Sequence, residues 1–157
     1  MEARIDFTSS KILQDFVKRI NATSAVVPKG TLPAGLANLV LTRASQINGC
    51  AVCVDMHTKD AGHDGETPVR LNLVAAWRDA SVFTEAERAA LELTEQATRI
   101  ADAAGGVTDE AWANAAKYYD SEQLAALVAT VAVINAYNRF NVVLKNQGGD
   151  YQPGQWG

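Results

Sequence analysis

Two cysteines and a histidine at helical spacing are the residues of this sequence best suited to chemistry. Cys50, Cys53 and His57 are separated by three and four positions, and the chain has no other cysteine. On an ideal helix, at about 100° per residue, the three side chains fall within about 60° of arc. Residues three apart have Cβ atoms about 5–6 Å apart, near enough for a disulfide after a modest adjustment. The spacing therefore predicts a redox-active dithiol with a histidine beside it.

The predicted position of Cys50 in its helix also favours reactivity. Asn48 is expected to cap a helix over about residues 49–61, which places Cys50 in the first turn. Unpaired backbone N–H groups and the helix dipole favour an anion there, so we expect a thiol with a lowered pKa. His57 is expected to accept the proton of the second cysteine and so help to generate the nucleophile.

Three interpretations of this cluster remain open from the residues alone. A reversible dithiol fits best, because two cysteines that close so short a loop add little stability to a fold. A zinc site would use the same ligand types, but only three are present and His63 lies in a predicted turn. The third interpretation is that the cysteines are two small core residues. It leaves unexplained why both cysteines and His57 fall on one face of a helix. Asp60, one turn past the histidine, either orients its ring or is a solvated charge.

Composition limits the class of protein and its location. The 157 residues are 48% hydrophobic and 20% charged, as in one globular domain. A net charge of −4 with interspersed signs argues against nucleic-acid binding. We find no apolar run that approaches the about 20 residues needed to cross a bilayer, and no secretory signal pattern at the N-terminus. We therefore expect a cytoplasmic protein that binds neither nucleic acid nor membrane.

Helices are expected to position these residues. Apolar periodicity, capping residues and breakers predict them over about residues 10–20, 33–46, 49–61, 68–77, 85–104, 109–119 and 124–144. The periodic segment around the β-branched run 127–134 is too long for a strand of about six residues, and we expect its helix at the centre of the bundle. Residues 1–157 are thus predicted to form a single all-α domain. Its extended C-terminal tail, from about residue 146, is expected to pack on a neighbouring subunit.

The segment from Leu41 to Ala61, with its Asn-Gly-Cys-Ala-Val-Cys core and His57, resembles the alkylhydroperoxidase D (AhpD) core of the carboxymuconolactone decarboxylase superfamily. Residues 75–78, 83–91 and 134–141 also fit, so the likeness covers most of the chain. The dithiol separates this sequence from the decarboxylases of the superfamily, which lack it. The resemblance implies an AhpD-like helical bundle, usually a homotrimer or homohexamer, that acts as a thiol-dependent peroxidase.

The resemblance also implies a role for each cysteine. Cys53 would attack the peroxide O–O bond and become a sulfenic acid. Cys50 would then condense with it to a disulfide and expel water, in agreement with the oxidation chemistry of paired thiols. An external dithiol, lipoyl-bearing in the best-known system, would restore the pair. The expected catalytic residues are therefore Cys53, Cys50 and His57, with no metal and no other cofactor.

Two positions of the family's proton relay differ in this chain. The glutamate expected twelve residues before the first cysteine is Asn38, and the histidine expected before the second is Val52. Asparagine forms hydrogen bonds but does not carry a proton at neutral pH, so only His57 remains of the relay. General acid–base help is worth about 10²–10⁴-fold in rate. We therefore expect weak or specialised turnover of hydrogen peroxide or small organic hydroperoxides. The alternative is a non-enzymatic dithiol redox module or sensor.

Overall fold

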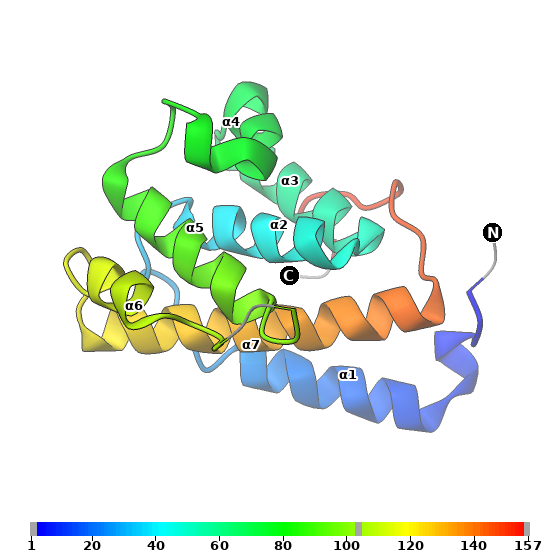
Figure 1. Cartoon of the computed structure of the whole chain (residues 1–157). Coiled ribbons are helices and arrows are strands. Elements are labelled where there is room, and N and C mark those ends of the chain that lie inside the picture. The colour runs from blue at the N-terminus through cyan, green and yellow to red at the C-terminus, as the bar shows by residue number, and fades with distance from the viewer. Residues whose placement is uncertain (1–2, 103–104, 156–157) are drawn as a thin grey trace.

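The structure is a computed structural model that describes residues 3–102 and 105–155. Within these ranges every regular element is a helix, which confirms the predicted all-α class. The elements are η1 (Phe7–Ser9), α1 (Lys11–Ser24), α2 (Leu36–Asn48), α3 (Ala51–His63), α4 (Pro68–Leu73), η2 (Val74–Asp79), α5 (Glu85–Thr98), α6 (Asp109–Ala115) and α7 (Ser121–Leu144). Figure 1 shows α7 as the longest element, with α1 along one side and the other helices on the opposite side.

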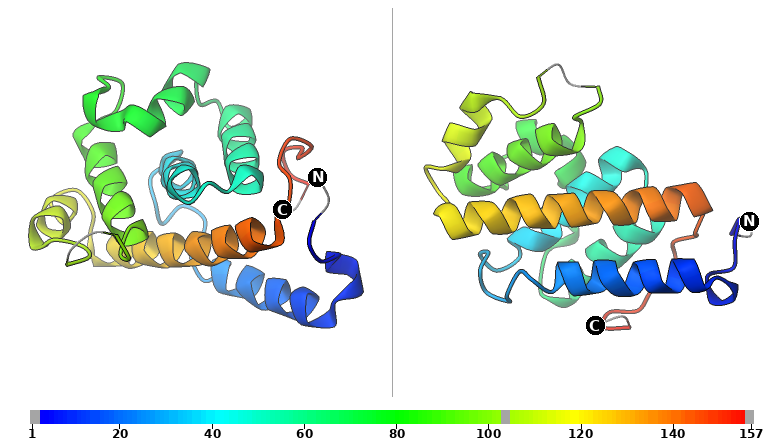
Figure 2. Two further views of the ribbon diagram at one scale, coloured as in Figure 1. Left: turned by 45° about the vertical axis from the view of Figure 1, so that its right-hand side comes forward. Right: turned by 90° about the horizontal axis from the view of Figure 1, so that it is seen from below.

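Helix α2 occupies the centre of the bundle. Figure 2 (left) shows it almost end-on inside a ring made by α3, α4, α5 and α7. It buries Leu39, Val40, Thr42 and Ala44 almost completely. The last helix was expected at the centre of the bundle, and that expectation was wrong. Helix α2 is the one that its neighbours enclose, whereas α7 keeps apolar residues exposed.

Helix α7 lies between α1 and the rest of the bundle (Figure 1), and part of its surface stays uncovered. Its apolar residues Val128, Val142 and Val143 remain 43–61% exposed. Contrary to the sequence prediction, Ser121–Leu144 is long and apolar enough to cross a membrane by length and composition alone. The core helix of a soluble protein passes the same test, and α7 packs against α1, α2 and α5. The apolar character of α7 alone therefore does not show whether lipid or protein surrounds it.

Capping chemistry sets most of the helix boundaries. Two capping boxes form, Thr84 with Glu87 and Asp120 with Gln123. Helix α5 ends at Thr98, before the predicted end at about residue 104, which lies outside the described residues. Pro33 precedes α2 instead of starting it, because the chain passes through Gly35 at φ 78° before the helix begins.

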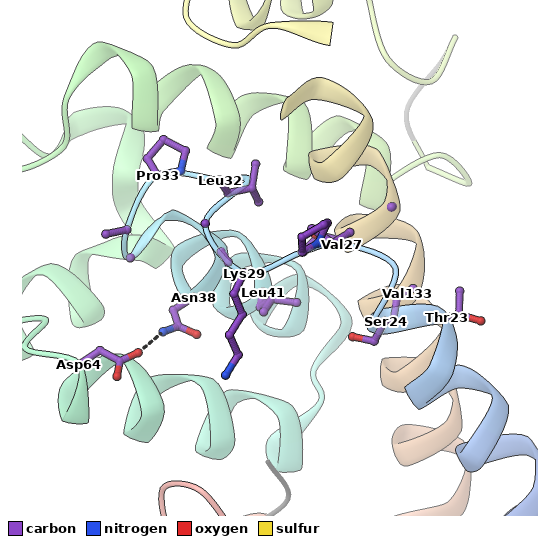
Figure 3. Close-up of a pocket in the computed structure, with 17 residues that line it drawn as sticks. Thr23, Ser24, Val27, Lys29, Leu32, Pro33, Asn38, Leu41, Asp64 and Val133 are labelled. Carbon is purple, nitrogen blue, oxygen red and sulfur yellow. Dashed lines mark hydrogen bonds between the residues drawn. The ribbon is translucent and has the colours of Figure 1, made fainter. Parts of the chain in front are cut away.

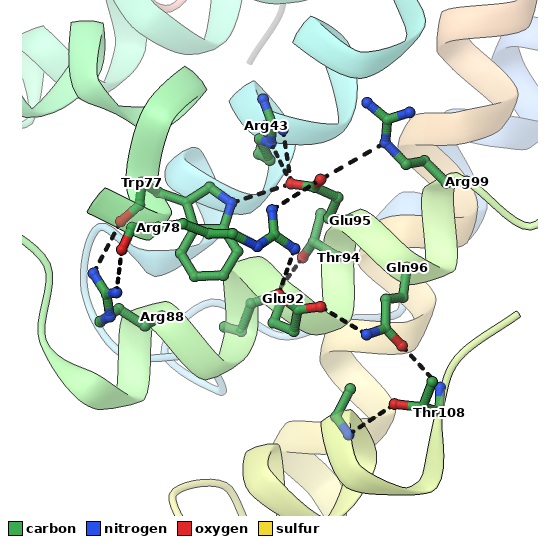
Figure 4. A network of polar contacts seen from close by, with 12 residues as sticks. Arg43, Trp77, Arg78, Arg88, Glu92, Thr94, Glu95, Gln96, Arg99 and Thr108 are labelled. Carbon is green, nitrogen blue, oxygen red and sulfur yellow. Dashed lines mark hydrogen bonds and ion pairs between the residues drawn. The ribbon is translucent and has the colours of Figure 1, made fainter. Parts of the chain in front are cut away.

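An ion network joins the central helix to its neighbours (Figure 4). Glu95 of α5 accepts hydrogen bonds from Arg43 of α2 at 2.7 Å and from the Trp77 indole of η2 at 3.1 Å. Arg78 and Arg99 also pair with it, at 3.0 and 3.7 Å. Burial alone would raise the pKa of Glu95, but the hydrogen bonds from its partners lower it to about 2. The network therefore fixes α2, which leads directly into the cysteine turn.

Candidate redox site

A tight turn connects the central helix to the cysteines. Gly49 closes α2 in the left-handed conformation, at φ 67°, which a glycine adopts without steric cost. Cys50 is the N-cap of α3, and its Sγ accepts from the backbone N–H of Cys53 at 3.4 Å. Asn48 was predicted to be this cap, and that was wrong. Its amide instead donates to two asparagines of α7, so the cap position passes to the cysteine.

The structure joins Cys50 and Cys53 in a disulfide, with their Cα atoms 5.4 Å apart. Both residues are only 1% exposed. They pack with Ala44 of α2 and Ile134 of α7 in one apolar cluster. Since Cys50 is the N-cap, unpaired N–H groups of the first turn of α3 lie beside this sulfur, where they favour negative charge. The two cysteines therefore lie next to each other, as the sequence predicts.

His57 lies on α3 one turn beyond Cys53 and is 8% exposed. Burial lowers its pKa from 6.5 to about 4, so the imidazole is neutral at neutral pH. Its Nε2 has no hydrogen-bond partner among the described residues. Asp60 does not orient the ring as considered, because its Oδ1 accepts from the Tyr151 hydroxyl at 2.9 Å. His57 is thus a neutral imidazole one turn beyond Cys53 on the same helix.

The buried imidazole makes stability depend on pH. Because the pKa of His57 is about 4 in the folded state and 6.5 as its ordinary value, the unfolded chain binds its proton first as pH falls. Stability is therefore lost between pH 6.5 and 4, by about 2 kcal/mol between pH 7.5 and 5. Urea unfolding at both pH values measures this loss, which His57→Leu should reduce and the exposed control His63→Gln should retain. An unchanged loss in His57→Leu would contradict the assignment.

Asn141 of α7 is a site residue that the sequence analysis did not select. Its Nδ2 donates to Cys53 Sγ at 3.4 Å. Asn135, Asn138 and Asn141 follow one another at three-residue intervals, and the first two bond to Asn48. Polar amides at helical spacing on an otherwise apolar helix were the available signal, because buried amides need partners. The structure shows that this face of α7 meets the cysteine turn.

A hollow of about 370 Å³ opens beside Cys50. Three segments line it, namely the turn 49–51, the end of α7 at residues 141, 142 and 145, and the start of the tail at 146–148. Cys50 lines this hollow, whereas Cys53 does not. The hollow therefore borders one cysteine of the pair and not the other.

The C-terminal tail is bound to α3 of its own chain. Asp55 Oδ2 accepts from the backbone N–H groups of Gly149, at 2.7 Å, and Tyr151, at 3.2 Å. Lys59 Nζ donates to the carbonyls of the same two residues. Burial alone would raise the pKa of Asp55, but its hydrogen bonds lower it. The tail was expected to pack on a neighbouring subunit. In the structure Asp55 and Lys59 hold it against α3.

Gly148 lets this tail approach the start of α3 closely. A Cβ at this position would lie 2.5 Å from the carbonyl oxygen of Ala51, which is backbone and moves only with the helix. Gly148→Ala should therefore displace the tail and destabilise the protein by about 1–3 kcal/mol. Urea unfolding and limited proteolysis after Lys145 measure both effects. Gly62→Ala is the matched control, because its Cβ would meet nothing within 4 Å.

A second cavity, of about 420 Å³, lies between the 27–35 loop, α2 and α7. Figure 3 shows Asn38 and Asp64 at one end of it, with Thr23 and Ser24 of α1 at the other. Asn38 Nδ2 donates to Asp64 Oδ2 at 3.4 Å, so this relay position is held by a carboxylate at the end of α3. Leu41 lines the cavity and also packs against the cysteine cluster.

The remaining relay position, Val52, and the three candidate zinc ligands lie at the start and middle of α3. Val52 is 9% exposed and belongs to the apolar cluster around the disulfide, where it supplies no titratable group. In the described ranges 3–102 and 105–155, no three His, Cys, Asp or Glu side chains form a group that could hold a metal ion. The zinc interpretation of Cys50, Cys53 and His57 is therefore not supported.

Comparison with known proteins gives one family match. Residues 14–96 match the Carboxymuconolactone decarboxylase family model. YdfG, an uncharacterized protein of Bacillus subtilis strain 168, is 40% identical over 109 residues. That alignment covers 69% of this chain and 73% of YdfG.

Solved structures share the fold. A protein of unknown function from Agrobacterium tumefaciens, suggested to be the antioxidant defence protein AhpD, is 32% identical with a TM-score of 0.86. The match covers 96% of this chain and all of that one. An uncharacterized peroxidase-related protein of Ralstonia eutropha JMP134 with an AhpD core has a TM-score of 0.73 at 19% identity, covering 87% and 72% of the two chains. This last likeness concerns the fold alone.

Proposed function

This chain is an AhpD-like member of the carboxymuconolactone decarboxylase family, and from its buried CxxC disulfide we propose that it is a thiol-dependent peroxidase. Its substrates would be hydrogen peroxide or small organic hydroperoxides. The observation that carries the proposal is the Cys50–Cys53 pair itself, closed at the start of α3. The burial of both cysteines, each only 1% exposed, supports a small substrate.

The proposed cycle begins with the reduced pair. Neutral His57 takes the Cys53 proton, and the resulting thiolate attacks the O–O bond. This attack leaves a sulfenic acid on Cys53 and an alkoxide or hydroxide, which takes up the proton. The Cys50 thiol then attacks the sulfenic sulfur, so that a disulfide forms and water leaves. An external dithiol, such as a lipoyl group in the cytoplasm, returns two electrons and two protons.

The test is peroxide consumption by the reduced protein. Stopped-flow mixing with limiting hydrogen peroxide should show loss of peroxide well above the rate of a free-thiol control. One equivalent of peroxide should lower the intact mass by two hydrogens. Loss of peroxide at the free-thiol rate, with Cys53 intact and reduced, would end the proposal.

A second candidate function is a non-enzymatic redox module. It is favoured by Asn38, which is bound to Asp64, and by Val52, which is apolar, since neither supplies a proton. In that case the disulfide would still form and be reduced reversibly, but peroxide would not be consumed catalytically. The mass change without turnover separates this function from the first.

We also propose that the protein is a homo-oligomer, a trimer or hexamer. Helix α1 buries none of its residues, and exposed apolar side chains occur on α1, in the segment before it and near the end of α7. These are Ile5, Phe7, Ile12, Phe16, Val142 and Val143. A second copy of the chain would cover these exposed apolar side chains. Size-exclusion chromatography with light scattering should give three or six times the 16.8 kDa chain mass. Ile12→Asp should lower that mass.

A further inference from the structure

We infer that the reducing thiol enters by the hollow beside Cys50, attacks the Cys50 sulfur and expels Cys53 as a thiolate that Asn141 stabilises. The inference rests on the proposed redox cycle and adds the direction of its reductive half. Two independent observations carry it, the access to one sulfur and the hydrogen bond to the other.

Access selects the sulfur that is attacked. The hollow of about 370 Å³ is lined by Cys50 but not by Cys53, and it is open between the end of α7 and the start of the tail. Thiol–disulfide exchange requires the attacking sulfur to approach one of the two bonded sulfurs. From this hollow, a slender thiol such as dithiothreitol or dihydrolipoamide reaches Cys50 first.

A side-chain hydrogen bond stabilises the sulfur that leaves. Asn141 Oδ1 accepts from Asn146 Nδ2 at 2.9 Å, which turns the amide so that its Nδ2 donates to Cys53 Sγ at 3.4 Å. A donor at this position stabilises a sulfur that gains negative charge more than a bonded, neutral sulfur. Cys50 Sγ also has a donor at 3.4 Å, the backbone N–H of Cys53, so the hollow sets the direction of attack. Asn141 stabilises the negative charge that this attack places on Cys53. Asn141 thus acts as a positioning residue for the leaving group.

The step balances without another reactant. The thiolate of the reductant bonds to Cys50 Sγ, the Cys50–Cys53 bond breaks, and its electron pair goes to Cys53. The second thiol of the reductant then attacks its own bridging sulfur and releases Cys50. The reductant ends as a cyclic disulfide, and its two protons remain on the two cysteines. Two electrons have passed to the protein.

Trapping tests the first part. Oxidised protein is mixed with 2-mercaptoethanol and quenched within milliseconds to seconds with N-ethylmaleimide, which alkylates the released cysteine. Fragment-ion mass spectrometry then locates each group on the peptide that holds both cysteines. The expected product carries mercaptoethanol on Cys50 and maleimide on Cys53. The reverse pattern, or an equal mixture, would overturn the inference.

The pH profile of alkylation tests the second part. In the Cys50→Ser background, Asn141→Leu should raise the pKa of the Cys53 thiol and slow its reaction with iodoacetamide about tenfold at pH 7. In the Cys53→Ser background the same substitution should leave the profile of Cys50 unchanged. Equal shifts in both backgrounds, or none in either, would contradict the role of Asn141. None of these measurements uses peroxide, so a failure of peroxidase activity remains separate from a failure of this inference.

Discussion

The Cys53→Ser variant is expected to lose peroxide turnover, with a fall of roughly 10³-fold or more in the catalytic rate. Removal of the nucleophile removes the whole covalent route, because serine at this position is neither ionised near neutral pH nor readily oxidised. A coupled assay with a dithiol reductant and hydrogen peroxide measures this loss. The alkylation state of Cys50, checked by mass, shows that the remaining thiol is intact.

Cys50→Ser is the matched variant, because it also replaces one sulfur atom with oxygen, but in the other cysteine of the pair. It should still consume about one equivalent of peroxide in a single turnover and then accumulate sulfenic acid on Cys53. Dimedone labelling followed by mass spectrometry detects that acid. If Cys53→Ser showed the single turnover and Cys50→Ser showed none, the assigned order of the two cysteines would be reversed.

The Glu95→Gln variant is expected to show the largest loss of stability among single charge changes, about 3–4 kcal/mol. Glu95 and Arg43 have side chains only 12% and 11% exposed, so loss of the carboxylate leaves a guanidinium buried without its counter-charge. Glutamine retains the shape and one acceptor oxygen, so the change reports chiefly on charge. Urea unfolding followed by circular dichroism gives the free energy of unfolding.

The same carboxylate sets a pH window and provides a control. Because the pKa of Glu95 is lowered to about 2 from an ordinary 4.5, its contribution is complete above pH 4.5 and is lost as pH falls towards 2. Glu95→Gln should therefore flatten the stability curve in this window only. The exposed Glu110, in the first turn of α6, should change stability by no more than about 0.5 kcal/mol when replaced by glutamine. A similar loss in both variants would show that burial of the pair contributes nothing.

The helices were predictable because their signals are local. Thr84 with Glu87 and Asp120 with Gln123 place a side-chain acceptor three residues before a free N–H group, and both boxes form. The proximity of Cys50 and Cys53 was predictable for the same reason, since helical spacing alone brings them together. The N-cap of α3 was not predictable in this way. Asn48 instead donates to amides of α7 that lie about 90 residues later in the chain.

The surroundings of the cysteines depend on contacts between distant segments. The central place of α2 could not be inferred from apolar character, because α7 is the more apolar helix yet leaves part of its surface exposed. The positions of Asn141 and of the tail depend on tertiary packing. A single sequence contains no direct signal for contacts between such distant segments. Asp55 was similarly overlooked, although it lies two residues from Cys53 and holds the tail.

The long sequence separation of the tail contact bears on the order in which the site is assembled. The α2–α3 hairpin and its CxxC turn use contacts between near neighbours, which form early because little chain must be closed. The Asp55–Gly149 and Cys53–Asn141 contacts span 94 and 88 residues. During synthesis from the N-terminus, both therefore wait for the last helix to leave the ribosome. The two cysteines consequently lack this part of their cover until residues 141–149 have been synthesised.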